Sequence, residues 1–167
     1  MVLAAGLGTR MAPLARLCAK PALPVLDVAV ILRLARALAA AGVERAIVNT
    51  HAHPETLHAA LRHSPLPIDW LREPEPRGSG GGILGARHLL DDGAPFLVVN
   101  GDMCLELDFG ALLKRHAESG SLATLALRDD PRKREFGSIG YDRAGHVCRI
   151  TERIDLAREK ASGLFIG

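Results

Sequence analysis

Strand-like and helix-like segments alternate along most of this chain, and this alternation limits the possible folds more than any other feature. Short apolar runs are followed by stretches in which apolar residues recur at helical spacing. Strands separated by helices pair in parallel, and the helices cross over the sheet. We therefore expect an α/β fold, a three-layer α/β/α sandwich with a mostly parallel, Rossmann-like sheet. The predicted strands are 1–5, 45–50, 68–71, 96–100 and 122–127, and the predicted helices are 28–41, 54–61, 83–90 and 109–119.

Residues that commonly begin or end helices support these boundaries. Pro54 suits the first turn of a helix, and Asp108 can cap the helix that follows it. Gly42 and Gly120 stand where left-handed C-terminal caps are common. These signals predict where three of the helices begin or end.

The last part of the chain has a different pattern. Residues 137–141 and 146–150 flank a short polar turn with a glycine, 142–145, which predicts a β-hairpin near the C-terminus. A further apolar run begins at Gly163 and is typical of a buried strand.

Length and composition exclude several classes of protein. With 167 residues, 48% hydrophobic and 24% charged, the chain resembles one folded domain over residues 1–167 and not a disordered segment. Its net charge is only +2 and the charges are mixed, so we expect no nucleic-acid partner. Three separated cysteines favour neither a disulfide framework nor a zinc site, and no apolar run reaches the length of a membrane span. These features predict a cytoplasmic protein without a membrane partner, and they leave the oligomeric state open.

Residues 3–11, LAAGLGTRM, form a glycine-rich segment directly after the first predicted strand. In open α/β sheets, ligands bind outside the carboxyl ends of the strands, where a glycine-rich turn lets backbone N–H groups approach a phosphate. The dinucleotide fingerprint is absent because Met11 stands in place of its third glycine, and the Lys-Ser/Thr of a Walker loop is absent too. A tight turn without a ligand is the alternative, but Arg10 and Lys20 favour a phosphate site.

The segment LAAGLGTRM, followed by Pro13-Leu14 and by KPALPV at residues 20–25, resembles the signature of the sugar-1-phosphate nucleotidyltransferases. In that family the pattern is roughly LAAGxGTRxxPLT and then PKPxxPV. The resemblance implies a nucleotide-binding α/β fold that forms a nucleotide-sugar and pyrophosphate from a nucleoside triphosphate and a sugar 1-phosphate. It also implies in-line attack on the α-phosphorus with Mg²⁺ as the cofactor.

The same resemblance implies roles for the matching residues. Arg10, from the GTR element, and Lys20, from the PKP element, would be catalytic because cations around the phosphates lower the barrier to phosphoryl transfer. The stretch GSGGGI at residues 78–83 lies where the family has a backbone surface for the base and ribose, and Glu73 is a further candidate contact. The residues expected to bind the nucleotide are Leu3, Ala4, Ala5, Gly6, Gly8, Thr9, Glu73, Gly78, Ser79 and Gly81.

The stretch VNGD at residues 99–102 follows a predicted strand, where an aspartate can reach a cation that bridges nucleotide phosphates. In the family this motif carries one of two magnesium-binding aspartates, which makes Asp102 the expected metal ligand and a catalytic residue. A turn or helix-capping aspartate is the alternative. The form VNGD is similar to that of N-acetylmuramate-1-phosphate uridylyltransferases and mannose-1-phosphate guanylyltransferases, which favours UTP or GTP.

The segment Thr151-Glu152-Arg153 occupies the place of the family's Glu-Lys element, which binds the sugar and its phosphate. Glu152 matches that element, whereas Arg153 replaces the lysine with a planar guanidinium of the same charge. The resemblance thus assigns the sugar 1-phosphate to Asn100, Gly140, Glu152 and Arg153.

Several positions depart from the family pattern. Ala12, Ala15 and Ala19 replace residues that are common there, and the second metal-binding aspartate would lie beyond Gly167. We therefore expect the chain to be incomplete at its C-terminus. Two other functions remain open, a truncated non-catalytic module that binds nucleotides or sugar phosphates and a phosphocholine-type cytidylyltransferase.

Overall fold

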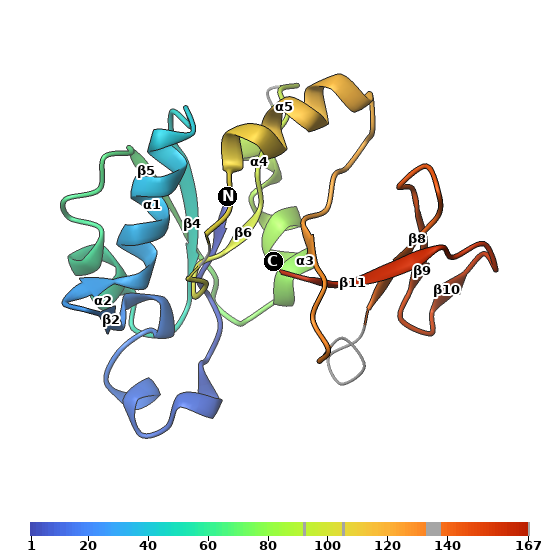
Figure 1. Cartoon of the computed structure of the whole chain (residues 1–167). Helices are drawn as coiled ribbons and strands as arrows, with labels where there is room; N and C mark the ends of the chain where they lie inside the picture. Colours follow the sequence, from blue (N-terminus) through green and yellow to red (C-terminus); the bar gives the residue numbers. More distant parts are fainter. Residues whose placement is uncertain (92, 105, 133–137, 167) are drawn as a thin grey trace. The chain divides into compact units, whose positions relative to one another are not determined.

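The computed structural model describes residues 1–91, 93–104, 106–132 and 138–166. The chain divides into two compact units, Met1–Ala111 and Leu112–Gly167 (Figure 1). Among the described residues, no helix has the length and apolar character needed to cross a membrane.

The first unit contains a parallel sheet of four strands in the order β5-β4-β1-β6. The register pairs Val2 of β1 with Val48 of β4 on one side and with Val99 of β6 on the other. The first strand in the sequence, β1, is therefore an inner strand of the sheet. The strands are β1 (Val2–Leu3), β4 (Ala46–Thr50), β5 (Ile68–Arg72) and β6 (Val99–Asn100).

Helices of the first unit connect these strands, and a small antiparallel pair precedes the first of them. The helices are α1 (Val30–Ala40), α2 (Pro54–Ala60), α3 (Gly78–Gly85), α4 (Arg87–Leu90) and α5 (Phe109–Ser119), the last of which continues into the second unit. The small pair is β2 (Pro24–Val25) with β3 (Val28–Ala29), and short 3-10 turns cover Thr9–Met11, Leu14–Arg16 and Lys20–Ala22.

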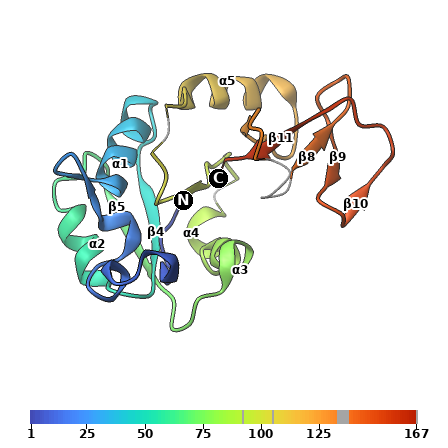
Figure 2. The ribbon, with the colours of Figure 1, turned by 60° about the horizontal axis from the view of Figure 1, so that its bottom comes forward.

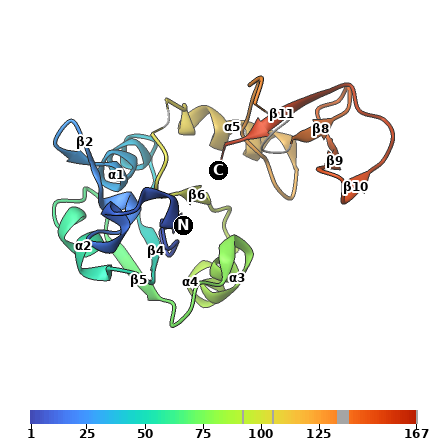
Figure 3. The same ribbon diagram turned by 90° about the horizontal axis from the view of Figure 1, so that it is seen from below.

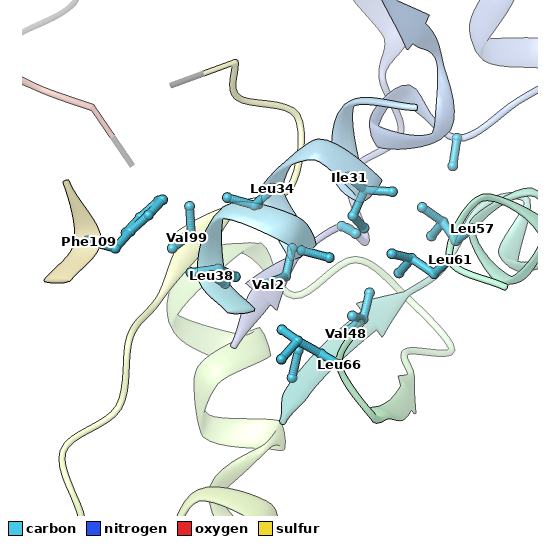
Figure 4. Packing of buried hydrophobic residues seen from close by; sticks show 14 residues of the cluster. Val2, Ile31, Leu34, Leu38, Val48, Leu57, Leu61, Leu66, Val99 and Phe109 are labelled. Carbon is cyan, nitrogen blue, oxygen red and sulfur yellow. The ribbon is translucent and has the colours of Figure 1, made fainter. Parts of the chain in front are cut away.

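The helices cover both faces of this sheet, which confirms the three-layer α/β/α sandwich. On one face, Val2, Val48 and Val99 pack against Ile31 and Leu34 of α1 (Figure 4). On the other face, Met1 and Ile47 pack with Ala86, next to Ile83 of α3 and Leu89 of α4. Figures 2 and 3 show α1 and α2 on one side of the strands and α3 and α4 on the other. Successive strand residues therefore point to opposite helical layers, as the two-residue period of a strand requires.

The predicted helix boundaries are largely confirmed by the backbone geometry. Gly42 follows α1 with φ +85°, and Gly120 follows α5 with φ +61°. Pro54 is the first residue of α2, and the Asp108 carboxylate accepts a hydrogen bond of 2.8 Å from the N–H of Ala111 in the first turn of α5.

Two segments differ from the prediction. The glycine-rich stretch before the predicted helix 83–90 is itself helical, since α3 begins at Gly78 and α4 follows as a separate short helix. Within this helix, close packing requires glycine at Gly82, where a Cβ atom would collide with the side chains of Asn49 and Glu73. The predicted strand 122–127 is instead β7 (Leu127–Arg128), since the side chain of Leu122 is fully exposed and nothing buries the start of that apolar run.

The second unit is an antiparallel sheet in the order β10-β9-β8-β11-β7. It contains the predicted hairpin, in which the Asp142 carboxylate accepts hydrogen bonds of 3.0 Å from the N–H groups of Ala144 and His146. The strand predicted from Gly163 is part of β11, which pairs with both β7 and β8. The further strands are β8 (Ile139–Tyr141), β9 (Val147–Ile150), β10 (Ile154–Asp155) and β11 (Ala161–Phe165).

Candidate functional site

A cavity of about 660 Å³ lies in the first unit, at the carboxyl ends of the parallel strands. Its walls come from the loop after β1, the 3-10 turn at Lys20, the ends of β4 and β6, and the start of α3. The glycine-rich segment after β1 predicts a ligand at this edge of the sheet. The lining residues are Leu3, Ala4, Ala5, Gly6, Leu7, Gly8, Thr9, Arg10, Met11, Lys20, Pro21, Asn49, Glu73, Pro76, Arg77, Gly78, Ser79, Asn100 and Asp102.

The structure thus brings together most of the residues that the sequence nominated. The same cavity is lined by the glycine-rich loop and by Arg10, Lys20, Glu73, Asn100 and Asp102. Lys20 and its contact Asp102 are 82 residues apart in the sequence. Gly81 is not among the described residues that line it, because that position on α3 faces the side chain of Arg77.

The loop after β1 requires glycine at position 8. Gly8 has φ +62°, a left-handed conformation that side chains disfavour, and a Cβ atom there would lie 3.3 Å from the Cβ of Lys20. Its carbonyl accepts a hydrogen bond of 2.8 Å from the N–H of Met11, which closes the 3-10 turn that contains Arg10. Arg10 is exposed at the rim of the cavity.

Lys20 and Asp102 form an ion pair in the cavity. The Nζ of Lys20 donates to Oδ2 of Asp102 at 2.5 Å, and the two side chains are 33% and 30% exposed. Asp102 follows β6, and the N–H of the preceding Gly101 donates to the carbonyl of Leu3 at 2.8 Å. A cation and a carboxylate therefore meet within reach of a ligand that enters the cavity.

The alanine before Lys20 has a structural explanation. Ala19 replaces the first proline of the family's PKP element, and its N–H donates a hydrogen bond of 3.1 Å to the hydroxyl of Thr56. Proline has no N–H and could not make this bond. The 3-10 turn that carries Lys20 is therefore tied to α2 by a contact that this departure from the family pattern makes possible.

Asp102 is the residue that could hold a metal ion in this cavity. Among the described residues, no group of three or more His, Cys, Asp or Glu side chains is arranged as a complete metal cage. A single carboxylate nevertheless fits a magnesium ion, which commonly binds to one or two carboxylates, to waters and to substrate phosphates.

A buried polar network lies at the other end of the cavity, beside α3. The Oδ1 of Asn49 accepts from the N–H of Ala4 at 2.7 Å, and its Nδ2 donates to Oε1 of Glu73 at 2.7 Å. The second carboxylate oxygen of Glu73 accepts from the N–H of Arg77 at 3.2 Å. Asn49 and Glu73 are only 3% and 5% exposed. The network joins the loop after β1 to the ends of β4 and β5 and to the start of α3.

Sequence reasoning missed Asn49, although one signal pointed to it. Asn49 is a carboxamide within the buried strand Ala46–Thr50, and a buried polar side chain needs hydrogen-bond partners. Gly82 of α3 lies directly against this network, where a Cβ atom would be 2.7 Å from Nδ2 of Asn49 and 3.0 Å from Oε1 of Glu73.

The other predicted sugar-phosphate residues belong to the second unit and stay predictions. Gly140 lies in β8, where a Cβ atom would be 3.0 Å from the Cβ of Arg149 and would also collide with Glu159. The side chains of Arg149 and Glu159 are hydrogen bonded, and this contact is the main cause that lowers the pKa of Glu159. Glu152 and Arg153 are exposed in the turn between β9 and β10.

Comparisons with known proteins agree with this geometry. The sequence model of the family described as Nucleotidyl transferase matches residues 1–165. A mannose-1-phosphate guanylyltransferase from Mycobacterium tuberculosis is 33% identical over 159 residues, which cover 93% of this chain and 44% of the relative. The catalytic subunit beta of the enzyme from Dictyostelium discoideum is 28% identical over 158 residues, 92% of this chain and 44% of that protein.

A solved structure adds to these findings. The crystal structure of HddC from Yersinia pseudotuberculosis complexed with GMP-PN superposes with a TM-score of 0.73 at 28% identity, covering 99% of this chain and 72% of that one. The chain spans less than half the length of the two guanylyltransferases described above. Nucleotidyltransferases of this kind generally use a divalent metal. Because the family match covers nearly all 167 residues, this chain belongs to the nucleotidyl transferase family.

Proposed function

We propose that this chain carries the nucleotide site of a sugar-1-phosphate guanylyltransferase, which forms a nucleotide-sugar and pyrophosphate from GTP and mannose 1-phosphate. The observation that carries the proposal is one cavity that combines cations, a candidate metal ligand and a buried carboxylate. Arg10, Lys20 and Asp102 would serve the triphosphate, and Glu73 would serve the base. Mannose 1-phosphate is proposed as the sugar substrate because the two relatives described above are mannose-1-phosphate guanylyltransferases. We place the proposed reaction in the cytoplasm, where nucleoside triphosphates are made.

The loop after β1 suits the triphosphate. A Cβ atom on Gly6 would meet no protein atom within 4 Å, so the packing of the chain does not require glycine there, whereas close approach of a ligand would. Arg10 and Lys20 would offset negative charge on the phosphates as pyrophosphate leaves. The fixed loop would hold the α-phosphorus in line with the attacking oxygen of the sugar phosphate.

Asp102 is expected to act on the same phosphates as Arg10 and Lys20. A magnesium ion bound there would neutralise phosphate charge while waters and phosphate oxygens complete its coordination. The Lys20 ammonium donates to Oδ2 of Asp102, and we expect it to turn to the phosphates when the nucleotide binds. Asn100 is expected to contact the sugar phosphate from the end of β6. The roles of Gly140, Glu152 and Arg153 stay predictions from the family resemblance.

Glu73 favours guanine over uracil at the base end. Each of its carboxylate oxygens already accepts one hydrogen bond from the protein and has a further lone pair. A carboxylate of this kind accepts two hydrogen bonds side by side, and the N1–H and N2–H₂ groups of guanine are neighbouring donors. Uracil offers a single N–H between two carbonyl acceptors, one of which would face the carboxylate. Binding of uracil would therefore place a carbonyl oxygen against a buried carboxylate oxygen of Glu73, and two acceptors that face each other without a donor cost free energy.

A coupled assay of pyrophosphate release tests the proposal. GTP, UTP, dTTP, CTP and ATP would each be paired with mannose 1-phosphate and with several other sugar 1-phosphates, in the presence of Mg²⁺. We expect release with GTP and mannose 1-phosphate, and its loss in the Arg10→Ala variant. Release with UTP but not GTP would contradict the choice of base. No release in any pairing, with nucleotide binding retained in calorimetry, would instead favour a non-catalytic nucleotide-binding module.

A further inference from the structure

We propose that Asn49 is a positioning residue that fixes the Glu73 carboxylate and thereby sets the preference of the cavity for guanine. The inference rests on the proposed function, because it takes Glu73 as the contact for the base. It adds a residue that lines the cavity and links the proposed base contact to the loop after β1. Asn49 has its amide buried between these two parts of the cavity.

The backbone of the loop determines which way the Asn49 amide points. The N–H of Ala4 can only donate, so the atom of Asn49 that faces it at 2.7 Å must be the carbonyl oxygen. The NH₂ group must then face Glu73, whose Oε1 lies 2.7 Å away. The reversed amide would place a donor against the N–H of Ala4 and an acceptor against Oε1 of Glu73. The main chain therefore fixes the amide, and the amide fixes an oxygen of Glu73.

The second oxygen of Glu73 is fixed in the same way. The N–H of Arg77 donates to Oε2 at 3.2 Å, so both carboxylate oxygens have protein donors and both act as acceptors. Gly82 lies against the Asn49–Glu73 contact, where even a methyl group would collide with both side chains. A carboxylate held at both oxygens presents its remaining lone pairs in one fixed direction. Fixed acceptors discriminate between bases, whereas a carboxylate free to rotate could avoid the carbonyl of a wrong base.

The two contacts of Asn49 can be separated by substitution. Asn49→Asp keeps an oxygen for the N–H of Ala4 but places a second buried carboxylate against Oε1 of Glu73. Two carboxylates this close share one proton, so Glu73 is no longer held as a full anion by an amide donor. It should therefore spare the phosphate loop and release Glu73. Asn49→Ser is too short to make either contact, so it should weaken both the loop and the base contact. Glu75→Gln is the matched control, because Glu75 is an exposed carboxylate two residues beyond Glu73.

The experiment is calorimetric binding of GTP, ITP and UTP to the full chain and to each variant. Inosine lacks the N2 amino group of guanine, so the ratio of the GTP and ITP affinities isolates one hydrogen bond to Glu73. For the wild-type chain and for Glu75→Gln we expect GTP to bind roughly tenfold more tightly than ITP, as for a hydrogen bond to a charged acceptor. For Asn49→Asp and Asn49→Ser we expect the ratio to fall to about twofold or less, with tighter ITP binding by Asn49→Asp than by Asn49→Ser.

The outcomes separate the two proposals. If the wild-type chain binds GTP, ITP and UTP equally well, the guanine preference itself is wrong. If the wild-type chain prefers GTP and both Asn49 variants keep the full tenfold ratio, the proposed function stands and the role of Asn49 is refuted. Asn49→Asp is nearly isosteric, and should it fail to fold, the ratio measured with Asn49→Ser decides the question. A purely structural role would weaken GTP and ITP binding by the same factor and leave their ratio unchanged, which would also refute the inference.

Discussion

The substitution Gly82→Ala tests how tightly α3 is packed on the polar network. A methyl group at this position would lie 2.7 Å from Nδ2 of Asn49 and 3.0 Å from Oε1 of Glu73, well inside van der Waals contact. Overpacking of a buried site costs about 1–3 kcal/mol, and disruption of a buried hydrogen bond costs about 1–3 kcal/mol more. The gain in helix propensity from glycine to alanine returns about 1 kcal/mol. We therefore expect the variant to lose roughly 1–5 kcal/mol of unfolding free energy.

The same helix supplies the control. Gly80 lies two residues earlier in α3, and a Cβ atom there would meet nothing within 4 Å. Gly80→Ala should therefore stabilise the first unit by about 0.5–1 kcal/mol through helix propensity alone. Urea denaturation followed by fluorescence measures both, because Trp70 is the single tryptophan of the chain and lies in β5 of the first unit. Equal unfolding free energies for the two variants, or a more stable Gly82→Ala, would refute the reasoning about this helix.

Three further predictions concern charges. Lys20→Ala should raise the affinity of the nucleotide-free chain for Mn²⁺ about fivefold. The substitution removes the Lys20 ammonium, which competes with the metal for Asp102 in an ion pair worth about 1 kcal/mol. Titration followed by electron paramagnetic resonance measures this affinity, and an unchanged or weaker affinity would contradict the competition. Asp102→Ala should abolish metal-dependent pyrophosphate release and lower the melting temperature by only about 2–4 °C, because the lost ion pair with Lys20 is worth about 1 kcal/mol; full activity would remove Asp102 from the mechanism. Burial, with a smaller effect of Arg45, lowers the pKa of the Met1 amino group from 8.0 to about 6. The unfolded chain then binds the proton more strongly, so stability should fall by about 2 kcal/mol as the pH drops from 8 to 6, in urea denaturation at each pH. N-terminal acetylation should remove this dependence, and an identical pH profile after acetylation would contradict the assignment.

The sequence predicts well those features that local chemistry determines. Pro54, Asp108 and Gly42 mark helix ends because their backbone and side-chain preferences act within a few residues. The alternation of strands and helices yields the parallel sheet, because a crossover helix permits little else. The loop at residues 3–11 was placed correctly at the carboxyl end of β1, since a glycine-rich turn after a strand has that position in any open α/β sheet.

Features that depend on distant contacts were not predictable in the same way. Gly78–Gly85 is helical although glycine has a poor helix propensity, and the packing of its Gly82 against Asn49 and Glu73 joins residues that are distant in the sequence. The role of Asn49 depends on a hydrogen bond to Ala4, a partner 45 residues away. The contact of Lys20 with Asp102 likewise becomes visible only when the ends of the strands are brought together.

An isotope-labelling experiment tests the central claim most directly. Mannose 1-phosphate labelled with ¹⁸O in its non-bridging phosphate oxygens would be incubated with GTP, Mg²⁺ and the full chain, and the products would be analysed by mass spectrometry. Attack of a sugar-phosphate oxygen on the α-phosphorus of GTP keeps every labelled oxygen in the nucleotide-sugar and places none in pyrophosphate. The account predicts GDP-mannose that carries the full label. Label in the pyrophosphate, or no labelled nucleotide-sugar at all, would contradict it.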